Sequence, residues 1–506
     1  MKNHFYLLVF IALAGCKKQP VISNTGPVQP VPEIQFLLTS TTNFGKFTGG
    51  EIYLKMTGDS AKGVVPVVSN QKSFVLSFIP ATANVKIGDV VQQSGVTVND
   101  FTKPITYTFT NAQGVFRSIK VSVTNFTGIP VFYLTTAGPV VSRDVYITGS
   151  LSVNPNGQFD QDTSAIPLTI KGRGNSTWGM PKKPYHIKFN KKAPLLGLPA
   201  AKDWVLLANY SDKTLLRNSV ALAIGQQFSA DFTPHYRFVE VIMNGVYLGD
   251  YNLTEQVEVN PGRVNITKMT TSDTSPDAIT GGYALELDQH LSDTPYFYTT
   301  KNLPITIQSP GAITASQLTY IHNYFQQTED AIFADNFADP INGYAKYINV
   351  DSFIDWYLVK ELMKDNDGLG YSSIFYYKDR GGKLGMGPVW DFDLAGGNTD
   401  YSDCKNPTGW WIRNAVWFNR LFQDPAFAAK VKARWVTLKP NFPAIFANID
   451  YEAAYIDKSQ QQNFQTWPIL NTYVWPNAVV LGNYSAEVGY LKNWLQTRID
   501  WMDANM

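Results

Sequence analysis

The hydrophobic pattern of this chain changes near residue 128. From about Glu33 to Phe126, short segments such as EIYLKM, SFVLSF, ITYTFT and FRSIKVSV alternate apolar and polar residues and are separated by Gly, Asn and Pro. A period of two is that of a β-strand, because successive side chains point to opposite faces of a sheet. Turn residues at this spacing are typical of a β-sandwich. We therefore predict a small all-β domain over residues 33–127, without a catalytic cluster.

Helical patterns appear after Gly128, among further strand-like segments. Residues 212–228 place apolar side chains three and four positions apart, and Ser211 or Asp212 is a suitable N-cap. Residues 351–364 repeat this pattern. The mixture of strand and helix patterns predicts one α+β domain over residues 128–506. Further helices are expected at 315–335, 413–438 and 481–503.

An acidic hairpin is predicted between residues 361 and 394. Its first strand, residues 372–378, is dense in Tyr, Phe and Ile, which suit a pleated surface. Residues 379–382, Asp-Arg-Gly-Gly, supply turn chemistry, and the second strand returns over residues 383–390. A hairpin brings the residues before its first strand beside the residues after its second. The two ends of this segment should therefore meet.

Four aspartates occupy those ends. Asp365 and Asp367 precede the first strand, and Asp391 and Asp393 follow the second. Gathered carboxylates repel one another unless a proton or a cation intervenes, and Mg²⁺ is the simplest candidate. Asp367 suits a general base for a hydroxyl group, and Asp391 suits a metal ligand that faces phosphates. The alternative is structural: Asp365 and Asp367 would cap and terminate a helix, and Asp393 would pair with an arginine.

A glycine loop is the second candidate site. Residues 171–179, KGRGNSTWG, are followed by KKPYHIKF at 182–189, which predicts a strand, a loop and a second strand. Glycines let backbone N–H groups approach an anion closely. Arg173 can bind phosphate with two donors, and Lys188 presents a point charge from a strand. The alternative is a basic, solvated hairpin.

A third segment, residues 239–264, predicts two strands joined by an Asn244-Gly245 turn. The connector after the second strand carries Glu255, Gln256 and Glu258. These side chains suit either the edge of a sheet or a nucleotide pocket, and the sequence does not separate the two.

The N-terminus predicts export and lipid attachment. An early Lys and an apolar run too short to span a bilayer make residues 1–15 a signal peptide. Leu-Ala-Gly-Cys at 13–16 resembles a bacterial lipobox, which implies cleavage before Cys16 and lipid on its sulfur. Residues 16–32 contain several prolines and predict a lipidated tether. We therefore expect an outer-membrane-anchored lipoprotein of the cell envelope, with no internal disulfide for Cys404.

Composition and motifs limit the classes of partner and of chemistry that we expect for this chain. The 506-residue chain has a formal net charge of +1, which argues against a general nucleic-acid binder. Its five histidines show no metal-ligand spacing, and neither a G-x-S-x-G elbow nor a Walker-type lysine motif occurs. Zinc, serine-hydrolase and P-loop chemistry are therefore not expected.

Two resemblances add to these predictions. The run at 94–114 resembles small Ig-like repeats found near the start of many bacterial surface lipoproteins, which makes the domain at 33–127 an expected Ig-like sandwich. Five ordered blocks resemble the CotH kinase family: RGNSTWGMPKKPYHIKF, LLGLPAAKDWVLLANYSDKTLLRN, YLGDYNLTEQVEV, GGYALELD and GPVWDFDLAGGN. That resemblance implies an atypical protein-kinase-like fold over 128–506 and transfer of phosphate from ATP to Ser or Thr of a protein substrate, with Mg²⁺ or Mn²⁺.

The resemblance also implies roles for individual residues. Asp367 matches the catalytic aspartate, and Asp391 matches the metal-binding aspartate, with Asp393 and Asn398 close enough to assist. The implied nucleotide-binding set is Arg173, Asn175, Ser176 and Lys188 near the phosphates and Glu255 near the adenine.

One position departs from the family pattern, because Asp365 stands where Asn is expected. ATP is also scarce outside the cytoplasm. A surface lipoprotein that binds a host protein or a glycan without catalysis is therefore the second hypothesis. A glycosidase with paired carboxylates is a third, but it gives the basic glycine loop no role.

Overall fold

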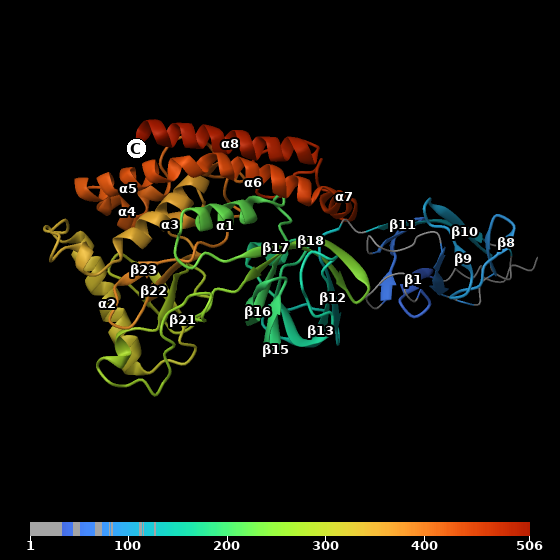
Figure 1. The fold of residues 1–506 in the computed structure, drawn as a ribbon, viewed down its shortest axis with the longest axis horizontal. Coiled ribbons are helices and arrows are strands. Elements are labelled where there is room, and N and C mark those ends of the chain that lie inside the picture. The colour runs from blue at the N-terminus through green and yellow to red at the C-terminus, as the bar shows by residue number, and fades with distance from the viewer. Residues whose placement is uncertain are drawn as a thin grey trace, which may run out of the picture.

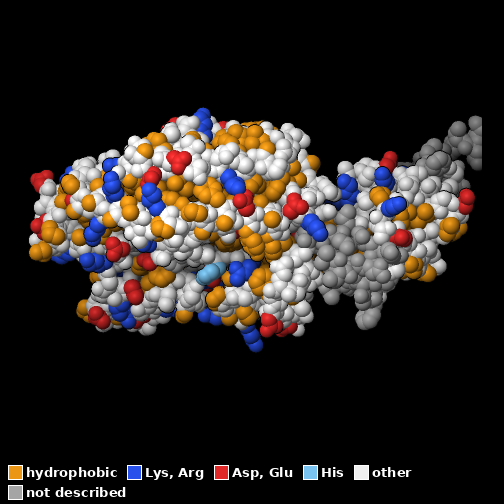
Figure 2. All heavy atoms as spheres, turned by 45° about the horizontal axis from the view of Figure 1, so that its top comes forward, with side chains coloured by type: hydrophobic (Ala, Val, Ile, Leu, Met, Phe, Trp, Pro, Cys, Tyr) orange, Lys and Arg blue, Asp and Glu red, His pale blue; other side chains and the backbone are white. Residues whose placement is uncertain are grey.

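The computed structural model describes residues 33–43, 51–65, 73–79, 81, 84–110, 114, 116–125 and 128–506. The molecule is elongated, with a β-rich region at one end, a β-barrel in the middle, and a sheet covered by helices at the other end (Figure 1). The predicted signal peptide, the tether and Cys16 lie outside the described residues. Figure 2 shows acidic and basic side chains interspersed over the visible face, as a net charge near zero suggests.

The N-terminal region is made of short strands around an aromatic core. The strands are β1 Gln35–Thr39, β2 Glu51–Tyr53, β3 Lys55–Thr57, β4 Ser60–Val65, β5 Phe74–Val75, β6 Ser77–Ile79, β7 Asn84–Ile87, β8 Val90–Val91, β9 Val98–Asn99, β10 Ile105–Thr110 and β11 Phe116–Asn125. They form sheets in the orders β2-β1-β6, β3-β4-β11-β10-β7-β8 and β5-β9. Phe36, Phe78 and Tyr107 are buried where these sheets meet. The prediction of a β-rich region is confirmed, and its Ig-like topology stays a prediction.

A closed barrel follows. Its strands are β12 Val131–Thr136, β13 Ile147–Asn154, β14 Ile166–Gly172, β15 Tyr185–Leu195, β16 Leu198–Leu207, β17 Tyr236–Met243 and β18 Val246–Glu255. The order is β12-β13-β14-β15-β16-β18-β17, and parallel pairing of β12 with β17 closes it. Apolar side chains from alternate positions, among them Ile187, Trp204 and Tyr251, fill the interior.

The predicted Asn-Gly hairpin forms part of the contact between the barrel and the N-terminal region. Asn244 and Gly245 have positive φ values of 49° and 78° and join β17 to β18. The backbone N–H of Tyr53 donates to the carbonyl of Gly245 at 2.7 Å. A Cβ at Gly245 would lie 2.5 Å from the carbonyl oxygen of Glu51, so the close approach requires glycine.

A five-stranded sheet carries the acidic hairpin. Its strands are β19 Tyr283–Leu287, β20 Tyr296–Tyr298, β21 Pro304–Ser309, β22 Ile374–Lys378 and β23 Leu384–Met386, in the order β20-β21-β19-β22-β23. The predicted hairpin is confirmed as β22 and β23. The second strand is shorter than predicted, and Pro388, which has no N–H for a ladder, follows it.

The described part of the chain contains eight α-helices, most of which form a layer along one side of the domain (Figure 1). They are α1 Arg217–Gln227, α2 Ala315–Phe333, α3 Val350–Met363, α4 Val416–Leu421, α5 Pro425–Leu438, α6 Phe442–Tyr455, α7 Asp457–Thr466 and α8 Tyr484–Asn505. All five predicted helical stretches are helical, although 413–438 is two helices, and α6 and α7 were not predicted. Among the described residues, no helix has the length and apolarity that crossing a membrane requires.

Helix α1 begins five residues later than predicted. The carboxylate of Asp212 accepts hydrogen bonds from the backbone N–H of Thr214 and of Arg217, which holds residues 212–216 as a turn. A side chain that bonds to nearby backbone competes with the helix, and this explains the later start.

Candidate active site

A deep cleft of about 1130 Å³ lies where the barrel, the five-stranded sheet and the loops after α3 and β23 meet. The barrel contributes mainly basic side chains, and the sheet and loops contribute mainly carboxylates. The charged lining residues are Arg143, Asp144, Lys171, Arg173 and Lys182 from the barrel side, and Glu286, Asp288, Asp293, Asp367, Asp391 and Asp393 from the other. The cleft is therefore polarised across its width.

The acidic hairpin delivers three of its four aspartates to this cleft. α3 ends at Lys364 in a left-handed conformation, and a 3₁₀ turn, Asp367–Leu369, follows. Burial raises the pKa of the Asp367 carboxyl, and the charge of Asp391 raises it further. Asp391 itself has a φ of 61°, a backbone conformation that few residues other than glycine adopt.

Asp393 has the most unfavourable electrostatic surroundings of the three. Burial raises the pKa of its carboxyl well above the usual range, with further contributions from Asp391, Asp367 and Asp365. Within the part of the chain that the structure describes, Asp393 forms no ion pair with an arginine, so that alternative is not supported. Repulsion of this kind would be relieved by a bound cation.

Asp365 does not line the cleft. Its side chain is fully buried, and Oδ2 accepts hydrogen bonds from Nζ of Lys360 at 2.7 Å and from the N–H of Gly368 at 3.1 Å. Burial raises the pKa of Asp365 to about 7, against the opposing charge of Lys360. The departure from the family pattern therefore lies beneath the cleft.

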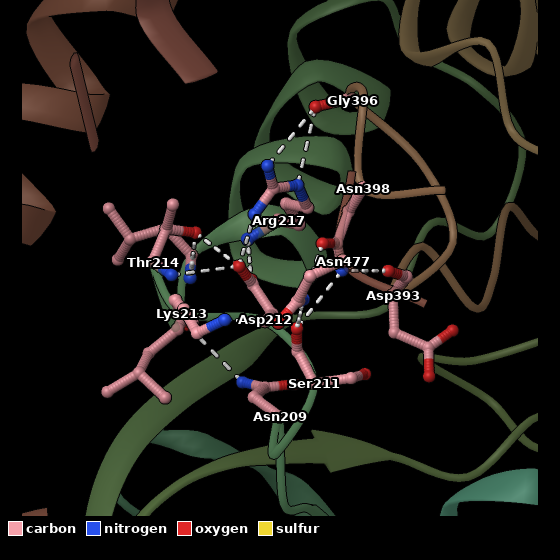
Figure 3. Close-up of polar contacts among 12 residues, drawn as sticks. Asn209, Ser211, Asp212, Lys213, Thr214, Arg217, Asp393, Gly396, Asn398 and Asn477 are labelled. Atoms are coloured by element: carbon pink, nitrogen blue, oxygen red, sulfur yellow. Dashed lines mark hydrogen bonds and ion pairs between the residues drawn. The ribbon is translucent and has the colours of Figure 1, made fainter. Parts of the chain in front are cut away.

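A buried polar network positions the loop after Asp393. The amide nitrogen of Asn398 donates to the carbonyl of Asp393 at 2.9 Å and to the carbonyl of Ser211 at 3.2 Å. Asn477 donates to the same Ser211 carbonyl and to Oδ1 of Asn398. Figure 3 shows the Asp393 carboxylate pointing away from this network, so the network holds the backbone and leaves the carboxylate free.

Arg217 extends this network to the next turn. Its guanidinium pairs with Asp212 at 2.5 Å and donates to the carbonyls of Ala395 and Gly396 (Figure 3). Both members of the ion pair are almost completely buried. The start of α1 is thereby joined to the segment that carries Asp393.

The glycine loop forms the opposite wall. Arg143 donates to the carbonyl of Gly174 at 2.7 Å and to Oδ1 of Asn175 at 2.8 Å, which fixes the loop between β14 and β15. Gly174 has a φ of 80°, and a Cβ there would lie 2.1 Å from Oγ1 of Thr177. Asn175 and Ser176, which the family resemblance places near the phosphates, line the cleft.

Arg173 faces the aspartates from this loop. Its guanidinium stacks over the ring of Trp390 at 5.5 Å. Burial lowers the pKa of Arg173, and the charges of Asp391, Glu286 and Asp393 oppose this shift. The group is directed into the cleft, with its donors available to a phosphate.

The structure does not bring Lys188 into the cleft. Tyr185, Ile187 and Phe189 fill the barrel, so Lys188 lies on the outer face, about half exposed and 3.8 Å from Asp203. The structure does not support the sequence prediction for this residue, because Lys188 lies farther along β15 from the glycine loop, opposite Thr169, and beside Asp203. His186, on the same outer face but one step nearer the loop, lines the cleft instead.

Glu255 is likewise outside the cleft lining, whereas Gln256 and Val257 belong to it. Its carboxylate is buried and accepts hydrogen bonds from the backbone N–H and from Nδ1 of His235, with Arg263 at 3.8 Å. The nucleotide-pocket prediction for Glu255 is replaced by a structural ion pair.

This ion pair predicts a pH-dependent contribution to stability. The hydrogen bond that His235 donates to Glu255 raises the pKa of His235 above its ordinary value of 6.5, against the effect of burial. Stability from this pair is therefore complete below that value and is lost as pH rises through the raised pKa. Thermal unfolding of the native protein and of His235→Gln should differ most below about pH 6 and converge above the folded pKa. A difference in melting temperature that grows with pH would contradict this.

Sequence reasoning missed part of the acidic wall. Glu286 and Asp288 come from the GGYALELD block, and burial followed by the charge of Asp288 raises the pKa of Glu286 to about 8. This block carries the family resemblance, and the signal that could have found the two residues is its period of two, which places Glu286 and Asp288 on one face.

Aromatic side chains at the mouth were missed as well. Tyr401 and Trp475 stack with an interplanar angle of 3° and remain about half exposed. Asn366 joins this pair to the site, because its amide donates to Oδ1 of Asp367 and to the hydroxyl of Tyr401. No local pattern places Tyr401 and Trp475 together, since they lie on separate loops.

The acidic residues fit a cation that is shared with phosphate. Among the described residues, no three His, Cys, Asp or Glu side chains are grouped as a preformed metal centre. Mg²⁺ usually takes one or two carboxylates and completes its coordination with water and phosphate oxygens. Asp391 and Asp393, which both line the cleft, are the residues that would hold such a cation.

The comparisons with known proteins define the family. The family model described as "CotH kinase protein" matches residues 170–502, more than half of the chain. This protein therefore belongs to the CotH kinase family, and membership indicates an atypical kinase that uses ATP. The matched segment includes the glycine loop and Asp367, Asp391 and Asp393.

No curated protein matches the chain. A crystal structure of a "putative glycoside hydrolase" from Bacteroides thetaiotaomicron is similar over 31% of this chain and 47% of that chain, with 18% identity and a TM-score of 0.13. The match spans less than half the length of that structure, and a TM-score this low carries no argument about fold or activity.

Proposed function

We propose that this protein transfers the γ-phosphoryl group of ATP to Ser or Thr hydroxyl groups of a protein. The observation that carries the proposal is the polarised cleft of a CotH kinase family member, with Arg173 on one wall and Asp367, Asp391 and Asp393 on the other. Phosphoryl transfer requires this arrangement, because catalysis consists mostly of positioning and of neutralising charge.

Each residue has a separate task in this mechanism. The glycine loop with Arg173, Asn175 and Ser176 binds the phosphates. Asp367 orients the acceptor hydroxyl and accepts its proton, and its raised pKa suits that role. Asp391 and Asp393 would hold Mg²⁺ or Mn²⁺, which neutralises phosphate charge when bound.

Incubation of the purified chain with γ-labelled ATP and either Mg²⁺ or Mn²⁺ tests the proposal. Label should appear on this protein or on an added envelope protein fraction, and should resist hydroxylamine, which cleaves an acyl phosphate but leaves phosphoserine and phosphothreonine intact. Nucleotide binding without any transfer to protein would contradict it.

A second function is favoured by the exposed aromatic pair. Tyr401 and Trp475 offer a flat surface that suits a sugar ring or an aromatic side chain of a partner. As a lipoprotein without catalysis, the protein would use this surface to bind a glycan or a host protein. Retention on immobilised glycans that Trp475→Ala abolishes, together with no heat on titration with Mg·ATP, would favour this second function.

We also propose that Cys16 is lipidated and anchors the protein in the cell envelope, as the lipobox resemblance implies. Metabolic labelling with a fatty acid should mark the native chain and leave Cys16→Ser unlabelled. Recovery of the native chain in the soluble fraction would count against an anchor.

A further inference from the structure

Lys360 lies in the last turn of α3, and its side chain is completely buried. Burial disfavours a charged amine, so a lysine here needs partners. The structure provides them: Nζ donates to Oδ2 of Asp365 at 2.7 Å and to the carbonyl of Trp390 at 2.5 Å. The amine also lies 4.3 Å from the ring centroid of Phe392.

These partners belong to the two separate segments that carry the cleft aspartates. Asp365 Oδ2 also accepts a hydrogen bond from the backbone N–H of Gly368 at 3.1 Å. The two residues joined by this hydrogen bond, Asp365 and Gly368, lie on either side of Asp367 in the chain. Trp390 and Phe392 flank Asp391 in the other segment. The ammonium group of Lys360 therefore contacts both the segment that carries Asp367 and the segment that carries Asp391. The proposed mechanism requires both of these aspartates.

Backbone hydrogen bonds join the same two segments farther along the chain. The N–H of Asn366 donates to the carbonyl of Leu394 at 3.1 Å, and the N–H of Gly396 donates to the carbonyl of Met363 at 2.7 Å. Both involve the second segment beyond Asp393. The contact of Lys360 with Trp390 holds the part before Asp391.

We infer that Lys360 is a positioning residue that sets the placement of Asp367 relative to Asp391, with Asp365 as its buried counter-ion. This inference rests on the proposed kinase function. It also explains why aspartate can stand at position 365: the carboxylate compensates the charge of Lys360 and is turned away from the cleft. An asparagine could keep the hydrogen bonds but would leave that charge unbalanced.

Three variants separate positioning from a general structural role. Lys360→Met leaves Asp365 as an uncompensated buried charge and should lower the melting temperature. The double variant Lys360→Met/Asp365→Asn removes that charge and should recover most of the melting temperature. Lys378→Met is the matched control, because Lys378 is also buried but donates to the carbonyls of Thr280 and Asp379 at the far end of β22.

The decisive result is the activity of the double variant. With stability recovered but the link to Trp390 missing, kcat should stay lower by about 10²-fold, while KM for ATP stays near that of the native protein. The control should keep kcat. Recovery of kcat together with the melting temperature would overturn the inference, because Lys360 would then be only a structural charge.

Hydrogen exchange provides a readout that does not depend on catalysis. In the double variant, the amides of residues 366–369 and 390–393 should exchange faster together, with α8 unchanged. If the native protein has no kinase activity, the proposed function is refuted. The exchange result would still show whether Lys360 couples the two segments. Unchanged exchange in both segments would overturn the coupling itself.

Discussion

Asp367→Asn and Asp391→Asn are each expected to reduce phosphoryl transfer to background without unfolding the protein. Loss of a positioned general base typically costs about 10²–10⁴-fold in rate, and loss of Asp391 also removes a cation ligand. Both changes are nearly isosteric. Transfer of labelled phosphate in single-turnover conditions measures the effect.

Although Asp391→Asn should lose activity, it should not lose thermal stability. The charge of Asp391 raises the pKa of both Asp367 and Asp393, so Asp391→Asn removes a repulsion from the folded state. We expect its melting temperature to equal or exceed that of the native protein. Asp403→Asn, at an exposed carboxylate outside the cleft lining, is the control and should keep activity. Native rates in both cleft variants would exclude the proposed mechanism.

The substitution Arg217→Met should cause the largest loss of stability among the changes considered. It would leave Asp212 buried without its partner and free the carbonyls of Ala395 and Gly396 (Figure 3). Removal of one member of a buried ion pair costs about 3–5 kcal/mol. Urea unfolding of the two proteins at one pH gives the difference directly.

Lys213→Met is the matched comparison for this change. Lys213 is buried in the same turn, but its amine donates to the neutral amide oxygen of Asn477, so its removal breaks a hydrogen bond rather than a close ion pair. The expected loss is about 1 kcal/mol. Addition of Asp212→Asn should restore part of the stability of Arg217→Met. Equal losses for Arg217→Met and Lys213→Met would show that the ion pair does not carry the effect.

Much of the site could be predicted because it is built from local chemistry. The hairpin of β22 and β23 has its turn and both strands within one short segment, so the proximity of Asp367 and Asp391 follows from chain geometry alone. The glycine loop is local in the same sense, since Arg173, Asn175 and Ser176 are neighbours in the chain.

The errors fall where a side chain's direction depends on distant partners. Lys188 and Glu255 have charges that suit a nucleotide, yet Lys188 lies too far along β15 from the glycine loop to line the cleft, and His235 and Arg263 enclose Glu255. The hairpin predicts that Asp365 gathers with the other three aspartates, but Lys360 holds it beneath the cleft.

The sequence by itself therefore determined the alternation of strands and helices, the acidic hairpin and the glycine loop, because each depends on residues within a few positions of one another. Only the tertiary structure decided which charges face the cleft, because burial and pairing depend on segments that meet after folding. The stacking of Arg173 on Trp390 and the network around Arg217 join residues more than 170 positions apart, a distance over which no local pattern carries information.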